Sequence, residues 1–587
     1  MHNPNEALKQ LRDAASLQDI AVLLGFKPKA LAYVLYIKPV GERYKKFEIP
    51  KRSGGSRTIS APYPDLKNLQ KRLTNLLQDC VAKIEANKKS NSVLSHGFRP
   101  KFSIITNAQG HRNRRYVFNV DLENFFGTIN FGRVRGFFIS NRDFQLKPEV
   151  ATIVAQIACF ENALPQGSPC SPVISNLIGH MLDIRLAALA YKVGCTYSRY
   201  VDDITFSTNK RDFPPAIARS ADGLSHEWNI GDELLLTIRR YGFSVNDKKT
   251  RMQYQGSRQE VTGLIVNSKL NTRFEYRHRA RAMVHLLRTT GSYYRTTTLA
   301  KEGEGLVTEK HDGTIDQLNG ILSFIDSVDV FNKKKDLSAE QRKIPLPYLE
   351  DTDGREKAFR DFLFYKHFFP QSRPLIICEG KTDNVYIKAA INALSDSYPE
   401  LVKKDGAGKP EFLVSVFRRT STTDRFLGLT GGSSQLVTLI KKYLTESKKV
   451  TVLKSTQPVV LIIDNDDGAK GVYSYLGKYL DLGKPVSNTV PFIKAGEKLY
   501  VIPTPLSPLG KSSMIEDFFE ESVRKTTLEG KTFNPKNEEL NHKSEYGKAY
   551  FAWHVVKKNQ ATINFNGFKP ILARLIVALN DHKAKHA

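Results

Sequence analysis

The sequence contains little cysteine and no long hydrophobic run. Its five cysteines are spread over 587 residues and form no CxxC pair, which supports neither a zinc site nor a disulfide framework. A reducing, cytoplasmic environment fits this usage. No run of about 18 apolar residues is present, so we expect no membrane span. The first residues lack an apolar signal core, so we expect no secretion.

Acidic residues are fewer than basic residues. The chain has 60 Asp and Glu against 88 Lys and Arg, a formal net charge of +28. A solvated surface is the simplest explanation, but so many unbalanced positive charges would repel one another. We therefore expect a polyanionic partner, namely nucleic acid. The apolar content of 41% is enough to bury real cores, which excludes wholesale disorder.

The pattern of apolar residues divides the chain into two bodies, about 1–330 and 370–587. The charged, proline-bearing stretch 333–354 is the clearest linker, and a helix follows at 355–369. The first body should begin with helices, a hairpin and a long helix, at 1–45, 46–61 and 64–90. In the second body, buried-type strands alternate with helices, which predicts a parallel α/β domain.

Acidic residues in the first body lie at predicted strand ends. An apolar strand runs into Asp121, and a tight turn between two β-prone stretches holds Asp202 and Asp203. Carboxylates placed this close resist joint ionisation unless cations lie among them, and two Mg²⁺ ions do this in phosphoryl transfer. An Asp-Asp pair alone is also an ordinary turn.

A loop rich in proline and glycine lies between these carboxylates. Gly167 permits close approach of the backbone to a bulky partner, and we expect Gln166-Gly167-Ser168 to open a helix. Such a loop can lie under a base and its template. A plain turn before a helix is the alternative.

Taken in order, FNVDL at 118–122, LPQGSPCSP at 164–172 and YVDD at 200–203 resemble the palm of reverse transcriptases. The resemblance implies an α+β right-hand polymerase in which Asp121, Asp202 and Asp203 are catalytic and bind two Mg²⁺ ions. It also implies contacts to the incoming dNTP or the template from Lys51, Arg57, Phe126, Gln166 and Gly167.

Three of these assignments have alternatives. Lys51 and Arg57 would contact the triphosphate from a hairpin that resembles the fingers, or would simply be solvated. Phe126 matches the bulky gate that excludes a nucleotide 2′-OH, and is otherwise a core residue. Lys249, with Lys248 as the alternative, matches the lysine that protonates pyrophosphate.

Two further motifs resemble signatures of retron reverse transcriptases. One contains Asn107, Ala108 and His111, and the other is Val261-Thr262-Gly263 at the start of the thumb. The resemblance implies that these regions help to recognise a cognate structured noncoding RNA. That RNA would be copied into branched DNA, primed from an internal RNA 2′-OH. His111 could instead be a satisfied structural histidine.

A second group of acidic residues follows the strands of the second body. One buried strand ends at Glu379, and another ends at Asp464 with Asp466 close behind. Catalytic groups in parallel α/β folds lie past such strand ends. Glu516, beside Asp517, adds a further carboxylate. Oxygen ligands without Cys or His favour Mg²⁺ or Mn²⁺, whereas a lone acidic strand end is otherwise a helix cap or turn.

A strand-end Glu-Gly followed by a strand-end DxD resembles a Toprim domain, the fold of topoisomerases, primases and OLD-family nucleases. The resemblance implies that Glu379 is catalytic or binds metal, and that metal ligation or support comes from Asp383, Asp464, Asp466 and Glu516. Lys543 or Lys548 would stabilise transition-state charge, and Gly431-Gly432 would admit DNA or form a turn. No topoisomerase-type tyrosine motif or primase zinc module is visible, so the domain is a nuclease or a nucleic-acid-binding scaffold.

We interpret the chain as a retron-type reverse transcriptase followed by a Toprim effector in antiphage defence. Its expected parts are an N-terminal helical region, fingers and palm, thumb, linker with connecting helix, and Toprim domain, at 1–45, 46–253, 254–332, 333–372 and 373–587. The implied partners are the noncoding RNA, its multicopy single-stranded DNA (msDNA) product, dNTPs and DNA, without a membrane and with self-association left open. The alternatives are a non-retron defence or group II intron-like reverse transcriptase, and a Toprim domain that only binds nucleic acid.

Overall fold

A computed structural model describes residues 6–51, 55–87, 93–221, 227–301, 305–406, 408–429, 433–450, 456–506, 512–536 and 540–586. The chain divides into two compact units. Unit 1 contains residues 1–277, 296–311 and 324–336, and unit 2 contains 278–295, 312–323 and 337–587. Most of the expected turn at 53–55, and Gly431-Gly432, lie outside the described residues.

Unit 1 begins with the expected helices and hairpin. The elements up to residue 109 are α1 (Ala7–Asp13), α2 (Leu17–Leu23), α3 (Pro28–Ala32), η1 (Tyr33–Ile37), η2 (Val40–Glu42), β1 (Tyr44–Pro50), β2 (Ser56–Pro62), α4 (Pro64–Ala86) and α5 (Ile104–Gln109). β1 and β2 pair antiparallel along their whole length, which confirms the hairpin. The long helix begins as expected and ends at Ala86, with its apolar face, from Leu66 to Leu77, in the core.

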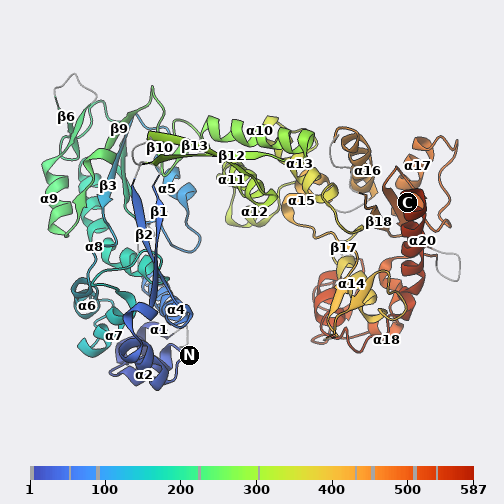
Figure 1. The fold of residues 1–587 in the computed structure, drawn as a ribbon, viewed down its shortest axis with the longest axis horizontal. Coiled ribbons are helices and arrows are strands. Elements are labelled where there is room, and N and C mark those ends of the chain that lie inside the picture. The colour runs from blue at the N-terminus through green and yellow to red at the C-terminus, as the bar shows by residue number, and fades with distance from the viewer. Residues whose placement is uncertain are drawn as a thin grey trace. The chain divides into compact units, whose positions relative to one another are not determined.

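The palm of unit 1 is an antiparallel sheet with strand order β4-β5-β3-β8. Strand β9 also pairs with β3, and both are labelled in Figure 1. Its strands are β3 (Tyr116–Glu123), β4 (Thr196–Tyr200), β5 (Asp203–Thr208), β8 (Ser244–Val245) and β9 (Arg251–Tyr254). Other elements of this region are α6 (Phe131–Ser140), α7 (Pro148–Ala158), α8 (Ser171–Lys192), β6 (Ala218–Ser220), β7 (Trp228–Ile230), α9 (Asp232–Arg240), η3 (Asp247–Lys249), β10 (Glu260–Val261) and β11 (Leu264–Ile265). Because β3 is central, its carboxyl end is held from both sides.

Helix α8 begins at Ser171 and not at Gln166, since Pro172 occupies its first turn and the preceding residues form a separate loop. Within the described residues, α8 is the single continuous helix long and apolar enough to cross a membrane by length and composition, and one bent pair of segments at the N-terminus also passes that test. Much of α8 is core: Ile174, Leu182 and Leu186 are fully buried against the palm.

The chain between residues 274 and 334 contributes to both units. Its elements are α10 (Phe274–Thr290), β12 (Tyr294–Lys301), β13 (Gly305–Asp312) and α11 (Ile315–Lys334). β12 and β13 form a two-stranded sheet. The unit boundaries therefore cross the stretch 254–332 that sequence reasoning assigned to a thumb.

Unit 2 contains a five-stranded sheet with order β17-β14-β18-β20-β19. Its strands are β14 (Leu375–Cys378), β17 (Ser415–Val416), β18 (Val459–Ile463), β19 (Ile493–Lys494) and β20 (Leu499–Pro503). The first four in spatial order pair in parallel, and β19 is antiparallel. Every residue of β14, β18 and β20 is buried, so both faces of the sheet are covered, as the near-continuous apolar runs predict.

The remaining elements of unit 2 are helices and short strands, many of them labelled in Figure 1. They are α12 (Ala339–Lys343), α13 (Gly354–Phe368), α14 (Asp383–Ala393), β15 (Val402–Lys404), β16 (Pro410–Phe412), α15 (Ser421–Leu427), α16 (Ser433–Ser447), η4 (Asp467–Ala469), α17 (Lys470–Tyr479), η5 (Ile515–Phe518), α18 (Glu521–Arg524), β21 (Thr532–Phe533), β22 (Glu545–Tyr546), α19 (Lys548–Tyr550), η7 (Phe551–Val556), η8 (Asn566–Phe568) and α20 (Lys569–His586). One sheet face packs with α14, η7 and α20 into a single core. The expected connecting helix is α13.

Candidate active sites in the two units

The three palm aspartates meet at the carboxyl end of β3. Asp121 and Asp203 are direct cross-strand neighbours in the β3–β5 register. Asp202 lies in the two-residue turn between β4 and β5, and its carbonyl accepts a hydrogen bond of 3.0 Å from the Leu122 amide. The structure thus brings together the three carboxylates that sequence reasoning singled out.

These carboxylates resist joint ionisation. Burial, followed by the charges of Asp202 and Asp121, raises the pKa of Asp203 to about 6. The pKa of Asp202 is also raised, first by burial and then by Asp121, and the charges of Lys249 and Arg57 oppose this shift. A cation in this position would therefore relieve a repulsion that the fold creates.

Lys249 supplies one such cation. Its ammonium lies 3.0 Å from both carboxylate oxygens of Asp121. The short helix η3 holds it there, because the Asn246 amide donates to the Asp121 carbonyl just upstream. Of the two lysines considered from the sequence, Lys249 is the one that reaches the palm carboxylates through a described contact.

The turn that holds Asp202 contains a strained residue. Val201 has φ of 62°, a left-handed conformation that is unfavourable for a β-branched side chain. A two-residue hairpin loop needs positive φ, and here Val201 adopts it without the help of glycine. The surrounding structure must therefore hold the turn in place.

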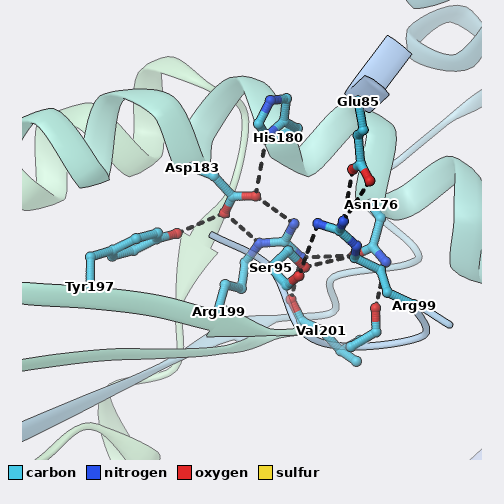
Figure 2. A network of polar contacts seen from close by, with 10 residues as sticks. Glu85, Ser95, Arg99, Asn176, His180, Asp183, Tyr197, Arg199 and Val201 are labelled. Atoms are coloured by element: carbon cyan, nitrogen blue, oxygen red, sulfur yellow. Dashed lines mark hydrogen bonds and ion pairs between the residues drawn. The ribbon is translucent and has the colours of Figure 1, made fainter. Parts of the chain in front are cut away.

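Arg199 provides this support from within the core (Figure 2). The side chains of Arg199 and Asp183 are both fully buried and joined by two hydrogen bonds of 2.6 and 2.8 Å. The second terminal nitrogen of Arg199 donates to the Val201 carbonyl at 2.8 Å. Tyr197 donates to Asp183 at 2.7 Å and completes the network. Sequence reasoning missed Arg199, although it is the one charged residue of the strand β4, a signal that could have found it.

The LPQGSP loop is attached to the fingers hairpin. The Ser60 amide donates to the Gln166 carbonyl at 2.8 Å. Gly167 has φ of 119°, and a Cβ atom there would lie 2.8 Å from the Ser60 carbonyl oxygen. The bulky partner expected for Gly167 therefore includes the chain's own strand β2.

The fingers residues Lys51 and Arg57 are exposed, and the charge of Arg57 opposes the rise in the pKa of Asp202. Phe126 is half-buried between Phe125 and Phe98, with ring centroids 5.5 and 6.4 Å away. Phe98 is itself 49% exposed and has φ of 55°, and no sequence motif marked it. The two rings form an aromatic pair with one exposed member.

The residues of the first retron-like signature are buried. Asn107, Ala108 and His111 are at most 1% exposed. His111 bonds the hydroxyls of Ser198 and Ser207 at 2.8 and 2.7 Å, one from each strand of the palm hairpin. Burial lowers the pKa of His111 to about 3, so the ring is neutral. These contacts are the ones expected if His111 is a satisfied structural histidine.

The second signature forms a tight turn. Thr262 and Gly263 join β10 to β11, with φ of 47° and 82°. Val261 is buried, whereas Gly263 is exposed with nothing within 4 Å of a Cβ placed on it. Both signatures share one small core, whose buried members are Ala108, Val117, Val261, Leu264, Val266, Leu270 and Val328. Segments far apart in the sequence are thus packed as one body.

The second candidate site lies where the sheet order of unit 2 reverses. After β14 the chain goes to β17 on one side and then to β18 on the other, so the carboxyl ends of β14 and β18 form a switch point. Glu379 follows β14 and Asp464 follows β18. The Asp464 amide donates to the Glu379 carboxylate at 3.1 Å. Arg419, which no motif marked, donates to the Glu379 carbonyl at 2.5 Å and fixes this strand end.

Further carboxylates converge on Asp464. Burial, then Asp383, Glu516 and Glu379, raises the pKa of Asp464 to about 8. Glu516 is 1% exposed, and burial raises its pKa to about 7. Its Oε2 atom accepts from Lys548 at 3.1 Å, while its buried Oε1 atom has no hydrogen-bond partner among the described residues.

The other residues proposed for this site have separate partners. Asp383 accepts from the Gly380 amide at 2.6 Å. Asp466 caps η4 and lines a cavity of about 520 Å³ with Tyr473, and its charge helps to raise the pKa of Glu379. Asp517 pairs with Arg524 at 3.2 Å instead of facing the site. Lys543 makes no described contact with these carboxylates, so Lys548 is the lysine at the site.

Both carboxylate groups have the donor chemistry for Mg²⁺ or Mn²⁺. Across the part of the chain that the structure describes, no three His, Cys, Asp or Glu side chains are already arranged as a metal cage. Two other observations indicate room for a cation. The Lys249 ammonium contacts the Asp121 carboxylate, and the buried Oε1 atom of Glu516 has no hydrogen-bond partner among the described residues.

An antiparallel sheet with carboxylates at the end of β3 and at the β4–β5 turn has the arrangement that two-metal nucleotide transfer needs. Residues 49–267 match the family described as "Reverse transcriptase (RNA-dependent DNA polymerase)". This part of the chain is therefore similar in sequence to reverse transcriptases, and it contains the three palm carboxylates.

The curated relatives that the chain resembles are retron reverse transcriptases. The chain is 36% identical over 286 residues to the Retron Mx65 reverse transcriptase of Myxococcus xanthus, covering 46% of this chain and 62% of that protein. It is 31% identical to the Retron Mx162 reverse transcriptase of the same organism, with 54% and 65% covered. It is 29% identical to the Retron Ec86 reverse transcriptase of Escherichia coli, with 54% and 85% covered. The chain thus spans less than two thirds of the two Myxococcus relatives.

Among solved structures, telomerase from Candida albicans in complex with a fragment of telomeric RNA is similar at 11% identity with a TM-score of 0.29, covering 55% of this chain and 64% of that one. No argument about this protein rests on a likeness of that size.

Proposed function

We propose that unit 1 is a retron reverse transcriptase that copies a cognate structured noncoding RNA into branched msDNA in the cytoplasm. The convergence of Asp121, Asp202 and Asp203 on one point is the observation that carries the polymerase activity. The similarity to three retron reverse transcriptases supports the retron class.

Each palm residue then has a defined task. The three aspartates would hold two Mg²⁺ ions, which in this chemistry activate the attacking hydroxyl and neutralise the triphosphate. Lys249 would exchange its contact with Asp121 for the departing pyrophosphate and deliver a proton to it. Arg57, with Lys51, would contact the triphosphate from the exposed hairpin.

The aromatic pair and the two signatures act around this centre. Phe126 would exclude a ribose 2′-OH, with Phe98 supporting the face of its ring. Since Asn107 and His111 are buried, they would act on RNA by shaping the surface, whereas the exposed Gly263 of the second signature could touch it directly.

The nucleic acid that copurifies with the protein tests this function. The protein is expressed with the DNA just upstream of its gene, and its nucleic acid is treated with RNase and then with debranching enzyme before a denaturing gel. A short DNA that shifts on debranching, and is lost in Asp203→Asn, supports a retron. Unbranched DNA would instead favour a non-retron or intron-like reverse transcriptase.

For unit 2 we propose a Toprim-type nuclease that depends on Mg²⁺ or Mn²⁺ and serves antiphage defence. The support is the meeting of Glu379, Asp464 and Glu516 beside Lys548 at the switch point of the sheet. Glu379 would take a proton from the water that attacks the scissile phosphodiester, or give one to the leaving oxygen. Asp464, Asp466 and Glu516 would hold metal with Asp383 in support, and Lys548 would face the developing charge.

Cleavage of DNA by the purified chain separates a nuclease from a scaffold. Asp464→Asn and Glu379→Gln should each abolish Mg²⁺-dependent cleavage while DNA binding remains. If neither change affects DNA cleavage or growth arrest, the nuclease proposal fails and a nucleic-acid-binding scaffold is the better description of unit 2.

A further inference from the structure

One helical stretch of unit 2 has a buried face and an exposed face of very different composition. It covers α19, η7 and the residues just beyond, 548–558. Phe551, Ala552, Val555 and Val556 are buried in the main core of the unit. The positions between them point outward and carry Tyr550, Trp553, His554, Lys557 and Lys558.

The exposed face is unusually rich in aromatic rings. Tyr550 is 50% exposed and Trp553 is 59% exposed. The rings of Tyr550 and His554 stack with centroids 4.5 Å apart and an interplanar angle of 24°. Leaving such large rings in water forgoes the stabilisation that burial would give, which marks a surface that meets a partner.

The charge of this stretch indicates what the partner is. Lys557 and Lys558 are exposed beside the rings, and Lys543 is exposed shortly before them. The stretch itself holds no acidic residue between Lys548 and Lys558. Rings that offer flat faces among lysines fit unpaired bases with their phosphates, whereas a paired duplex would keep its base faces inside.

We propose that Tyr550, Trp553 and His554, flanked by Lys557 and Lys558, form a stacking platform for single-stranded nucleic acid. The platform starts two residues after Lys548, whose ammonium contacts Glu516 in the candidate second site. It therefore binds the strand that reaches those carboxylates, and this last step rests on the function proposed for unit 2. The binding of single strands to the platform does not depend on that function.

The two tryptophans of the chain make the platform directly observable, since Trp228 is the other one. In a Trp228→Phe background the fluorescence reports Trp553 alone. The full chain, freed of copurifying nucleic acid at high salt, is titrated with oligo(dT), oligo(U) and a matched duplex. We expect the single strands to quench the emission and the duplex not to.

Point variants assign the binding to these residues. Tyr550→Ala should weaken the quenching titration roughly 5- to 150-fold, the equivalent of about 1–3 kcal/mol for one stacked base. Tyr479→Ala removes a 43% exposed tyrosine from α17 of the same unit and should change nothing. Lys557→Glu with Lys558→Glu should weaken binding and flatten its salt dependence.

The outcomes distinguish the stacking platform from the nuclease function proposed for unit 2. Quenching in Glu379→Gln without cleavage supports the platform whatever the fate of the nuclease. Emission that no oligonucleotide changes overturns the platform. Emission that changes with protein concentration alone, without oligonucleotide, also overturns it and identifies a second copy of the chain as the occupant.

Discussion

Removing Arg199 should slow polymerisation without unfolding the palm, provided that its buried partners are removed with it. Truncating Arg199 alone would leave Asp183 buried and unpaired, at a cost of about 3–5 kcal/mol. That is a large part of the roughly 5–15 kcal/mol that keeps a domain folded. The triple variant Arg199→Met, Asp183→Leu, Tyr197→Phe replaces these three members of the network with apolar groups of similar size. Such replacements are often neutral.

The expected loss of activity follows from one hydrogen bond. In the triple variant the Val201 carbonyl loses the 2.8 Å bond from the Arg199 guanidinium while the turn keeps its strained φ of 62°. A hydrogen bond from a charged donor contributes about 1.5–3 kcal/mol. If that energy positions Asp202 and Asp203, kcat falls roughly 10- to 150-fold.

Steady-state incorporation of dTTP on a poly(rA)·oligo(dT) template measures this effect. KM for dTTP should stay unchanged because the fingers are untouched, and chemical unfolding should show a folded palm. Arg133→Met is the matched control. Arg133 also donates to backbone carbonyls, those of Thr128, Tyr241 and Gly242, but not to the turn. A folded triple variant with wild-type kcat would refute the positioning role of Arg199.

Three other outcomes are expected. Gly167→Ala should destabilise unit 1 by about 1–3 kcal/mol, since its Cβ would meet Ser60, whereas Gly256→Ala, with nothing within 4 Å, should be near neutral in urea unfolding. Because the pKa of His111 is about 3 when folded and about 6.5 when unfolded, the unfolded state binds more protons below pH 6.5. The free energy of unfolding should then fall by about 2 kcal/mol from pH 6.5 to 5, and His111→Gln should remove that part of the urea-measured slope. Lys548→Met should raise the pKa of Glu516 further and abolish DNA cleavage, with polymerase activity intact; cleavage at the normal rate would exclude a role for Lys548.

Motif order was enough to locate the palm. Asp121 and the Asp202-Asp203 turn could be placed from the sequence because strand ends and tight turns leave local signals, and the β3–β5 register then brings them together. The same holds for Glu379 and Asp464, because parallel strands end at the same edge of a sheet. The order of residues around a strand end or a tight turn is therefore enough to place these carboxylates.

Contacts between distant segments could not be predicted in this way. The choice of Lys548 over Lys543 depends on how η5 and α19 pack, and no local pattern reports that. The burial of His111 depends on serines from two strands that follow it by more than 80 residues. Nothing in the residue type of Val201 predicts a left-handed backbone, because the rest of the fold imposes it.

The small core shared by the two retron-like signatures restricts how such proteins can be recombined. Three segments, residues 104–108 of α5, 261–270 around β10 and β11, and 324–331 of α11, pack with Val117 of β3 into one common volume. Exchanging only one of these segments with a relative would pair side chains selected against different neighbours, and leave cavities or clashes. A chimaera built to accept another template would need all three segments transplanted together from the same relative.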